Sequence, residues 1–141
     1  RVEWTINDFS ARTRDVARNQ ALWSEKFTIL GAADVQLEFF PQGRDSTAFP
    51  GFCALFLWCP AGVQMKYRLQ VGKHFAAPDE DSYDMRMGHG HSNFCMLEAH
   101  VNKETDSLLI GLDILEIRVR MEPEPGLRLF NHGPEAAVAR E

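Results

Sequence analysis

Apolar and polar side chains alternate at every second residue along most of the chain. The alternation covers residues 2–6, 26–29, 35–39, 65–71, 83–87 and 115–119. Because successive side chains of a β-strand point to opposite faces of its sheet, this pattern predicts strands with one buried face. Residues 52–59, FCALFLWC, are apolar throughout, which is typical of a central strand covered on both faces.

The pattern predicts an all-β fold, an antiparallel β-sandwich of seven to eight strands, because short strands separated by turn residues are typical of two packed sheets. The turn after residues 35–39 is marked by the sequence Pro41-Gln42-Gly43. The residues expected in the core are all large and apolar: Trp4, Phe27, Leu37, Leu55, Leu57, Leu69, Phe94, Leu115 and Ile117.

Three segments lack a clear alternation. Residues 10–22 fit either a short helix, with Ser10 as its N-cap, or an irregular segment. Residues 97–110 fit either a helix or a strand. Residues 122–141 contain three prolines and two glycines and have no sustained period. We therefore predict one β-sandwich domain over residues 1–121, followed by a tail or linker over 122–141.

Composition narrows the classes of partner. The 141 residues carry a formal net charge of −5 with scattered Lys and Arg, which argues against nucleic-acid binding, and no run approaches the ~18 apolar residues of a membrane span. Three cysteines are too few, and odd in number, for a disulfide framework, so we expect a cytoplasmic or nuclear location. The chain begins with Arg1 and lacks a signal peptide, so we expect a piece of a longer protein.

Six short motifs occur in order between residues 2 and 119. VEWTINDFS matches W-x-I-x-x-F-S, SEKF matches S-x-x-F, and LEFFPQGR is similar to l-x-l-Y-P-x-G with Phe40 in place of the tyrosine. FCALFLW is similar to L-S-L-Y-L, GHGHSNF fits G-x-x-x-F, and LDILEIRV fits D-x-L-x-I-x-V. Together they resemble the MATH (meprin and TRAF homology) family, a β-sandwich of about this size.

The resemblance implies a protein–protein interaction module that binds a short, extended peptide segment of a partner protein in a groove on one sheet. The family occurs in receptor-signalling adaptors, in substrate adaptors of cullin ubiquitin ligases, in a deubiquitinase and in meprin proteases, and the domain itself is not catalytic there. Glu38-x-Phe40 stands where receptor adaptors have Arg-x-Tyr. This inversion of charge argues against recognition of their acidic motif.

The segment MGHGHSNFC, residues 87–95, carries the candidate chemistry. His89, His91 and Cys95 would be the residues of a metal- or cysteine-dependent enzyme, but structural zinc needs four ligands and a catalytic cysteine needs a base within hydrogen-bond reach. Two histidines without a role in an exposed loop are another interpretation. The resemblance implies a third, in which His89-Gly90-His91 forms one wall of the peptide groove and Gly90 allows a ligand strand to approach closely.

The resemblance also implies aromatic groove walls. The predicted peptide-binding residues are Phe56, Tyr67, Tyr83, His89, Gly90 and His91. The acidic run PDEDSYD, residues 78–84, is expected to be a solvated loop or, beside a groove, to favour basic ligands. We expect no metal or cofactor, and the sequence gives no oligomeric state. A purely structural, self-associating domain stays open as an alternative, because exposed sheet edges can pair with copies of themselves.

Overall fold

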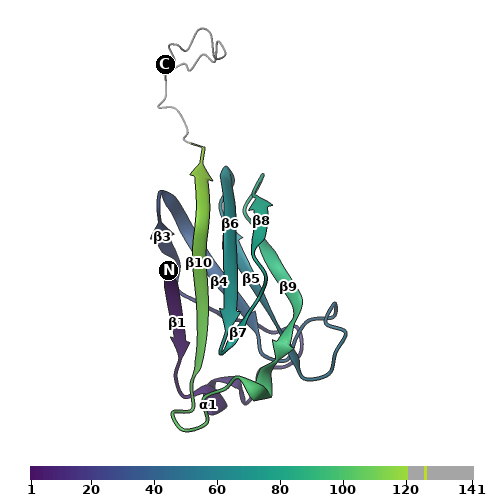
Figure 1. The fold of residues 1–141 in the computed structure, drawn as a ribbon. Coiled ribbons are helices and arrows are strands. Elements are labelled where there is room, and N and C mark those ends of the chain that lie inside the picture. The colour runs from purple at the N-terminus through teal and green to yellow at the C-terminus, as the bar shows by residue number, and fades with distance from the viewer. Residues whose placement is uncertain (121–125, 127–141) are drawn as a thin grey trace.

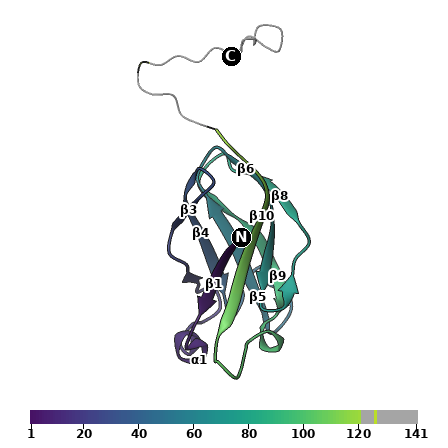
Figure 2. The same cartoon turned by 60° about the vertical axis from the view of Figure 1, so that its left-hand side comes forward.

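A computed structural model describes residues 1–120 and Gly126 and confirms the all-β sandwich, with two five-stranded antiparallel sheets (Figures 1 and 2). The first sheet has β7 and β8 both paired with β6; its strands are β1 (Val2–Ile6), β10 (Leu108–Val119), β6 (Val63–Val71), β7 (His74–Phe75) and β8 (Asp79–Ser82). The second has β2 and β3 both paired with β4; its strands are β2 (Leu22–Trp23), β3 (Phe27–Ile29), β4 (Ala32–Phe40), β5 (Phe52–Cys59) and β9 (Met87–Met96).

The strands exceed the predicted seven to eight because β2, β3, β7 and β8 are edge segments of only two to four residues. The long strands β4, β5, β6 and β10 match alternating or fully apolar stretches of the sequence. Among the described residues, no helix is long and apolar enough to cross a membrane.

The core lies between the sheets, and β5 is covered on both of its faces as predicted. Leu55 and Leu57 point into the main core and are fully buried. Ala54 and Phe56 point the other way and are buried with Phe40 in a second, smaller cluster on the outer face of the second sheet. Among the residues expected in the core, Leu37, Leu55, Leu57, Leu69 and Phe94 are buried, while Trp4, Phe27 and Ile117 are half-buried against it.

The prediction that Leu115 is buried is wrong. Strand β10 contains a bulge between Ile114 and Glu116, where its register against β6 shifts by one residue. The extra residue at the bulge is Leu115, and 49% of it is exposed. A shift of one residue exchanges the two faces of a strand. Ile114, before the bulge, and Ile117, after it, therefore both face the core.

The two ambiguous segments are mostly irregular. Residues 10–22 contribute to the short helix α1 (Phe9–Thr13), whose N-cap is Asp8 and not Ser10. Residues 97–110 contain a 3₁₀ turn, η1 (Leu97–Ala99), and the start of β10. Helix α1 lies at the opposite end of the sandwich from the end of β10 (Figure 1). The predicted tail over 122–141 and the domain boundary at 121 lie outside the described residues, apart from Gly126.

Candidate functional site

Strands β8 and β9 lie on the same side of the sandwich, at edges of different sheets (Figures 1 and 2). His91 Nε2 on β9 lies 2.7 Å from Asp79 Oδ2 on β8. Two residues away on each strand, His89 Nδ1 lies 3.7 Å from Asp81 Oδ1. Each of these four side chains keeps 27–35% of its surface exposed. Polar contacts therefore join the two sheets at an edge that a ligand can still reach.

Two buried tyrosines support this arrangement from the interior. Tyr67 donates its hydroxyl hydrogen to Asp81 Oδ2 at 2.6 Å, and Tyr83 donates to the carbonyl oxygen of Leu57 at 3.0 Å. The Tyr83 ring packs nearly edge-on against His89, with centroids 4.8 Å apart. Burial raises the pKa of both phenols, and the bond to Asp81 raises that of Tyr67 further. We call Tyr67, Asp79, Asp81, Tyr83, His89 and His91 the His–Asp cluster.

The two-residue period of a strand accounts for the matched spacing of these side chains. Asp79 and Asp81 share the inward face of β8, opposite Tyr67 and Met65 of β6, while Glu80 is exposed. The prediction that the acidic run is a solvated loop is therefore wrong for residues 79–82. Strand β8 has no apolar alternation to reveal it. The available signal was its Asp-x-Asp spacing, which matches the His-x-His spacing of β9.

The structure brings together four of the six predicted site residues, namely Tyr67, Tyr83, His89 and His91. Phe56 lies on the outer face of the second sheet, where its ring packs edge-on against Phe40 with centroids 6.0 Å apart. The Arg44 guanidinium lies 4.7 Å from the centre of the Phe56 ring. Phe56 and the His–Asp cluster are thus on opposite faces of one sheet, and they do not form a continuous wall.

Gly90 is exposed on β9 and is the Cα partner of Phe56 on β5. A Cβ atom added there would lie 2.7 Å from the Cα atom of Phe56 and closer still to the carbonyl oxygen of Leu55. Such a contact requires the backbone to shift, so close packing against β5 itself explains this glycine. The expected close approach of a ligand strand is not needed to account for it.

The outer face carries aromatic residues that the sequence reasoning did not select. The Trp58 indole N–H donates to Glu38 Oε1 at 2.8 Å, and its ring lies where a side chain at residue 88 would be, so Gly88 makes room for it. Trp23 packs against Trp58 with centroids 5.7 Å apart and is itself 44% exposed. We call Trp23, Phe40, Phe56 and Trp58 the outer aromatic patch. The aromatic side chains are visible in the sequence, but the fully apolar run of β5 does not show which of them point outward.

Cys95, the third residue of the metal and enzyme interpretations, lies apart from the His–Asp cluster, and so does the nearby His100. Cys95 is buried and its sulfur faces Cys53, with 3.8 Å between the two Sγ atoms. His100 packs against His74, with ring centroids 5.9 Å apart. Within residues 1–120 and Gly126, no three His, Cys, Asp or Glu side chains are grouped so that they could hold a metal ion.

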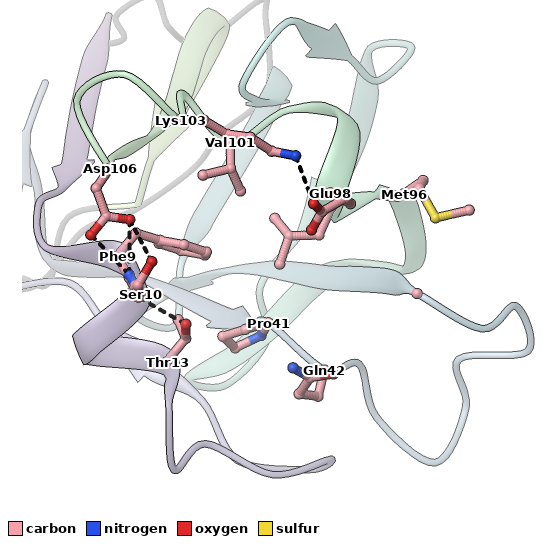
Figure 3. A pocket seen from close by; sticks show the side chains of 12 residues that line it. Phe9, Ser10, Thr13, Pro41, Gln42, Met96, Glu98, Val101, Lys103 and Asp106 are labelled. Carbon is pink, nitrogen blue, oxygen red and sulfur yellow. Dashed lines mark hydrogen bonds and ion pairs between the residues drawn. The ribbon is translucent and has the colours of Figure 1, made fainter.

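Two open recesses lie elsewhere and share no lining residue with the His–Asp cluster. One, of about 630 Å³, lies between α1 and the segment after β9 (Figure 3). Its polar side chains mostly bond to one another: Ser10 donates to Asp106 at 2.7 Å, and Lys103 donates to Glu98 at 2.8 Å. The second, of about 670 Å³, adjoins it and is lined by residues that include Gly72, His100 and Leu109.

Comparison with models of known protein families and with curated proteins finds no match to this chain. The resemblance to the MATH family is therefore supported by the short sequence motifs alone. Several residues of these motifs have a role in the fold: Ile6 and Phe9 are buried in the core, and Ser24 Oγ accepts a hydrogen bond from the Leu37 amide at 2.9 Å.

Proposed function

We propose that this domain binds a short, extended peptide segment of a partner protein, which adds as a further strand along the free edge of β9. The observation that carries the proposal is that β9, ten residues long, pairs only with β5 among the described residues. An unpaired edge offers main-chain donors and acceptors to an incoming strand. Gly90, which has no side chain, is exposed on it, so main-chain atoms are accessible at this residue. Farther along, the loop after β4 hydrogen-bonds to Ser92 and Asn93.

The side chains on the two faces of β9 support this role. An added strand would direct alternate side chains toward the His–Asp cluster and toward the outer aromatic patch. Acidic residues outnumber basic ones beside the cluster: Asp79, Glu80, Asp81 and Asp84 are all within six residues. The guanidinium of Arg86, the nearest basic residue in the sequence, donates to the Asp34 carbonyl oxygen at 2.6 Å. A ligand with Lys or Arg at a position facing the cluster is therefore favoured.

The motif resemblance supports the same role, since MATH domains recognise partner peptides in receptor adaptors and in ubiquitin-ligase substrate adaptors. On this proposal the chain is the recognition domain of a larger cytoplasmic or nuclear protein. Its task is binding and not catalysis.

A peptide-library screen against the purified domain, followed by N-methylation of the best binder one amide at a time, tests the mode of binding. Pairing with an edge strand predicts that N-methylation of alternate amides abolishes binding, because only every second amide of the ligand faces β9. Methylation of the amides between them should have little effect. Uniform tolerance, or chemical-shift changes confined to residues outside β8 and β9, would refute the proposal.

A double variant, His89→Ala with His91→Ala, tests the side chains. It should lose at least ~1 kcal/mol of affinity, or about fivefold, the usual contribution of a neutral hydrogen bond. The control is Lys103→Ala with Glu104→Ala, two exposed residues at the α1 end of the domain, which should bind as the parent does. Equal affinity for all three proteins would exclude the His–Asp cluster from the site.

A further inference from the structure

Cys53 on β5 and Cys95 on β9 are direct Cα partners in the antiparallel pairing of these strands. Their Sγ atoms lie 3.8 Å apart, and the residues are 0% and 4% exposed. Facing residues of antiparallel strands have Cα atoms roughly 4.5–5.5 Å apart. A disulfide accommodates Cα separations of about 4.4–6.8 Å. The backbone therefore already has a spacing that a disulfide between these residues would accept.

We propose that Cys53 and Cys95 form a redox-sensitive pair that a peroxide converts into an intramolecular disulfide joining β5 to β9. The two free thiols of this structure are the reduced state of the pair. This modification site is independent of the proposed peptide binding, because it requires only that the two sulfurs approach each other inside the domain.

The environment of the two sulfurs favours Cys95 as the thiol that reacts first. A hydrogen bond from the Cys53 thiol lowers the pKa of Cys95, against the opposing effect of burial, while the same bond and burial raise the pKa of Cys53. Since the thiolate is the nucleophile and Cys95 is also the less buried of the two, we expect the Cys95 sulfur to react first. Cys59, the third cysteine, has a pKa raised to about 11 by burial.

The reaction balances with hydrogen peroxide as the oxidant. The Cys95 thiolate attacks one peroxide oxygen, the O–O bond breaks, and the second oxygen leaves as water after taking up a proton, which gives a sulfenic acid on Cys95. The Cys53 sulfur then attacks the Cys95 sulfur. The S–S bond forms, the S–O bond breaks, and the hydroxyl group leaves as water with the proton of Cys53. Two thiols lose two hydrogens, and one peroxide is reduced to two waters.

Access for a small oxidant comes from the position of Cys95 near the end of an edge strand. The neighbouring residue Met96 is exposed and lines the recess of Figure 3. Pairing between β5 and β9 is also interrupted between Cys53 and Leu55. Edge strands with interrupted pairing open locally more readily than central strands, and such openings would admit peroxide to Cys95.

The test uses the reduced, purified chain, treated with hydrogen peroxide and then digested without reductant. We expect the intact mass to fall by two hydrogens, a cross-linked peptide pair containing Cys53 and Cys95, and full reversal by dithiothreitol. The melting temperature should rise by roughly 5–15 °C on oxidation, because the cross-link closes a long loop. A Cys59→Ala variant should behave as the parent does, and a Cys95→Ala variant should show neither the mass loss nor the rise.

Peptide mapping of the parent protein decides the result even if a core variant fails to fold. A gain of oxygen without the loss of two hydrogens would overturn the proposal. So would a disulfide that includes Cys59, or a cross-linked dimer on a non-reducing gel.

Discussion

Raising the pH above about 10, where phenols ordinarily ionise, should unfold this domain, because both of its tyrosines are buried as neutral phenols. The chain has two tyrosines, Tyr67 and Tyr83, which are 0% and 2% exposed. Burial is the main cause that raises the pKa of each. In the unfolded chain both would ionise in the ordinary range, so alkali stabilises the unfolded state relative to the folded one.

The size of the effect follows from proton linkage. A group whose pKa is raised by folding contributes its full stabilisation below the unfolded pKa and loses it as the pH rises toward the folded pKa. Each tyrosine that stays neutral in the fold costs about 1.36 kcal/mol of unfolding free energy per pH unit above about 10. Two tyrosines cost about 2.7 kcal/mol per unit, or roughly 5 kcal/mol between pH 10 and 12. That loss is comparable to the whole stability of many small domains.

The assay is an alkaline titration that follows phenolate absorbance and far-ultraviolet circular dichroism together. We expect the phenolate signal to appear only with the cooperative loss of β-structure. Tyr67→Phe and Tyr83→Phe should each reduce the pH slope of the unfolding free energy above pH 10 by about 1.36 kcal/mol per pH unit. Each should also lower stability at neutral pH by about 1 kcal/mol or more through the lost hydrogen bond. The three proteins differ in no other titratable group, so the difference in slope isolates the phenols. Phenolate formation centred near pH 10 in a protein that keeps its native dichroism would refute the reasoning.

Two further predictions concern the core and His100. Leu55→Ala should cost about 2–5 kcal/mol of unfolding free energy, because it removes a fully buried side chain, whereas Leu115→Ala at the bulge should cost less than ~0.5 kcal/mol; equal losses in urea denaturation would contradict the bulged register. Burial, His74 and Lys73 lower the pKa of His100, so its contribution to stability is present above the unfolded value near 6.5 and is lost as the pH falls below it. The difference between the unfolding free energies at pH 7 and pH 5 should be smaller in a His100→Gln variant than in the parent. An unchanged difference would show that His100 does not contribute to the pH dependence of stability.

The strands that sequence alone could predict are those that bury a regular apolar face. In β1, β4 and β6 the two-residue period comes directly from alternate side chains that enter the core. Strand β8 could not be found in this way, because its sequence is Asp-Glu-Asp-Ser and its inward face meets histidines and a tyrosine instead of apolar groups. A polar edge strand is specified by its partners, which lie far away in sequence.

The bulge in β10 left a weak trace in the sequence. Leu112 and Ile114 keep one phase of the alternation, and Ile117 and Val119 keep the other, three residues after Ile114. The bulge adds a single residue, Leu115, at the change of phase. However, Leu115, Ile117 and Val119 by themselves form an equally regular alternation. Register against β6 decides between these alternatives, and that register is set by the packed sheet.

The predicted site illustrates how much depends on the face to which one residue points. Residue 89 and residue 91 share a face of β9, so their joint location follows from the two-residue period once the strand is known. Phe56 belongs to the neighbouring strand, and whether it faces inward or outward depends on β5, whose fully apolar sequence carries no alternation to show it. Because β5 is apolar on both faces, the sequence could not show that Phe56 and the His–Asp cluster lie on opposite faces of the sheet.

Strand β9 combines two properties that usually exclude each other in a stable sheet. Its ten residues offer an edge long enough to accept another strand, yet such an edge is also a site for self-association. The contacts of His89 and His91 with β8 fasten its first half to the other sheet, and Cys95 lies beside Cys53 in its second half. The contacts with β8 favour an extended main chain in the first half of β9 before any ligand arrives. On the proposed mode of binding, less conformational entropy is then lost when a peptide pairs with this strand.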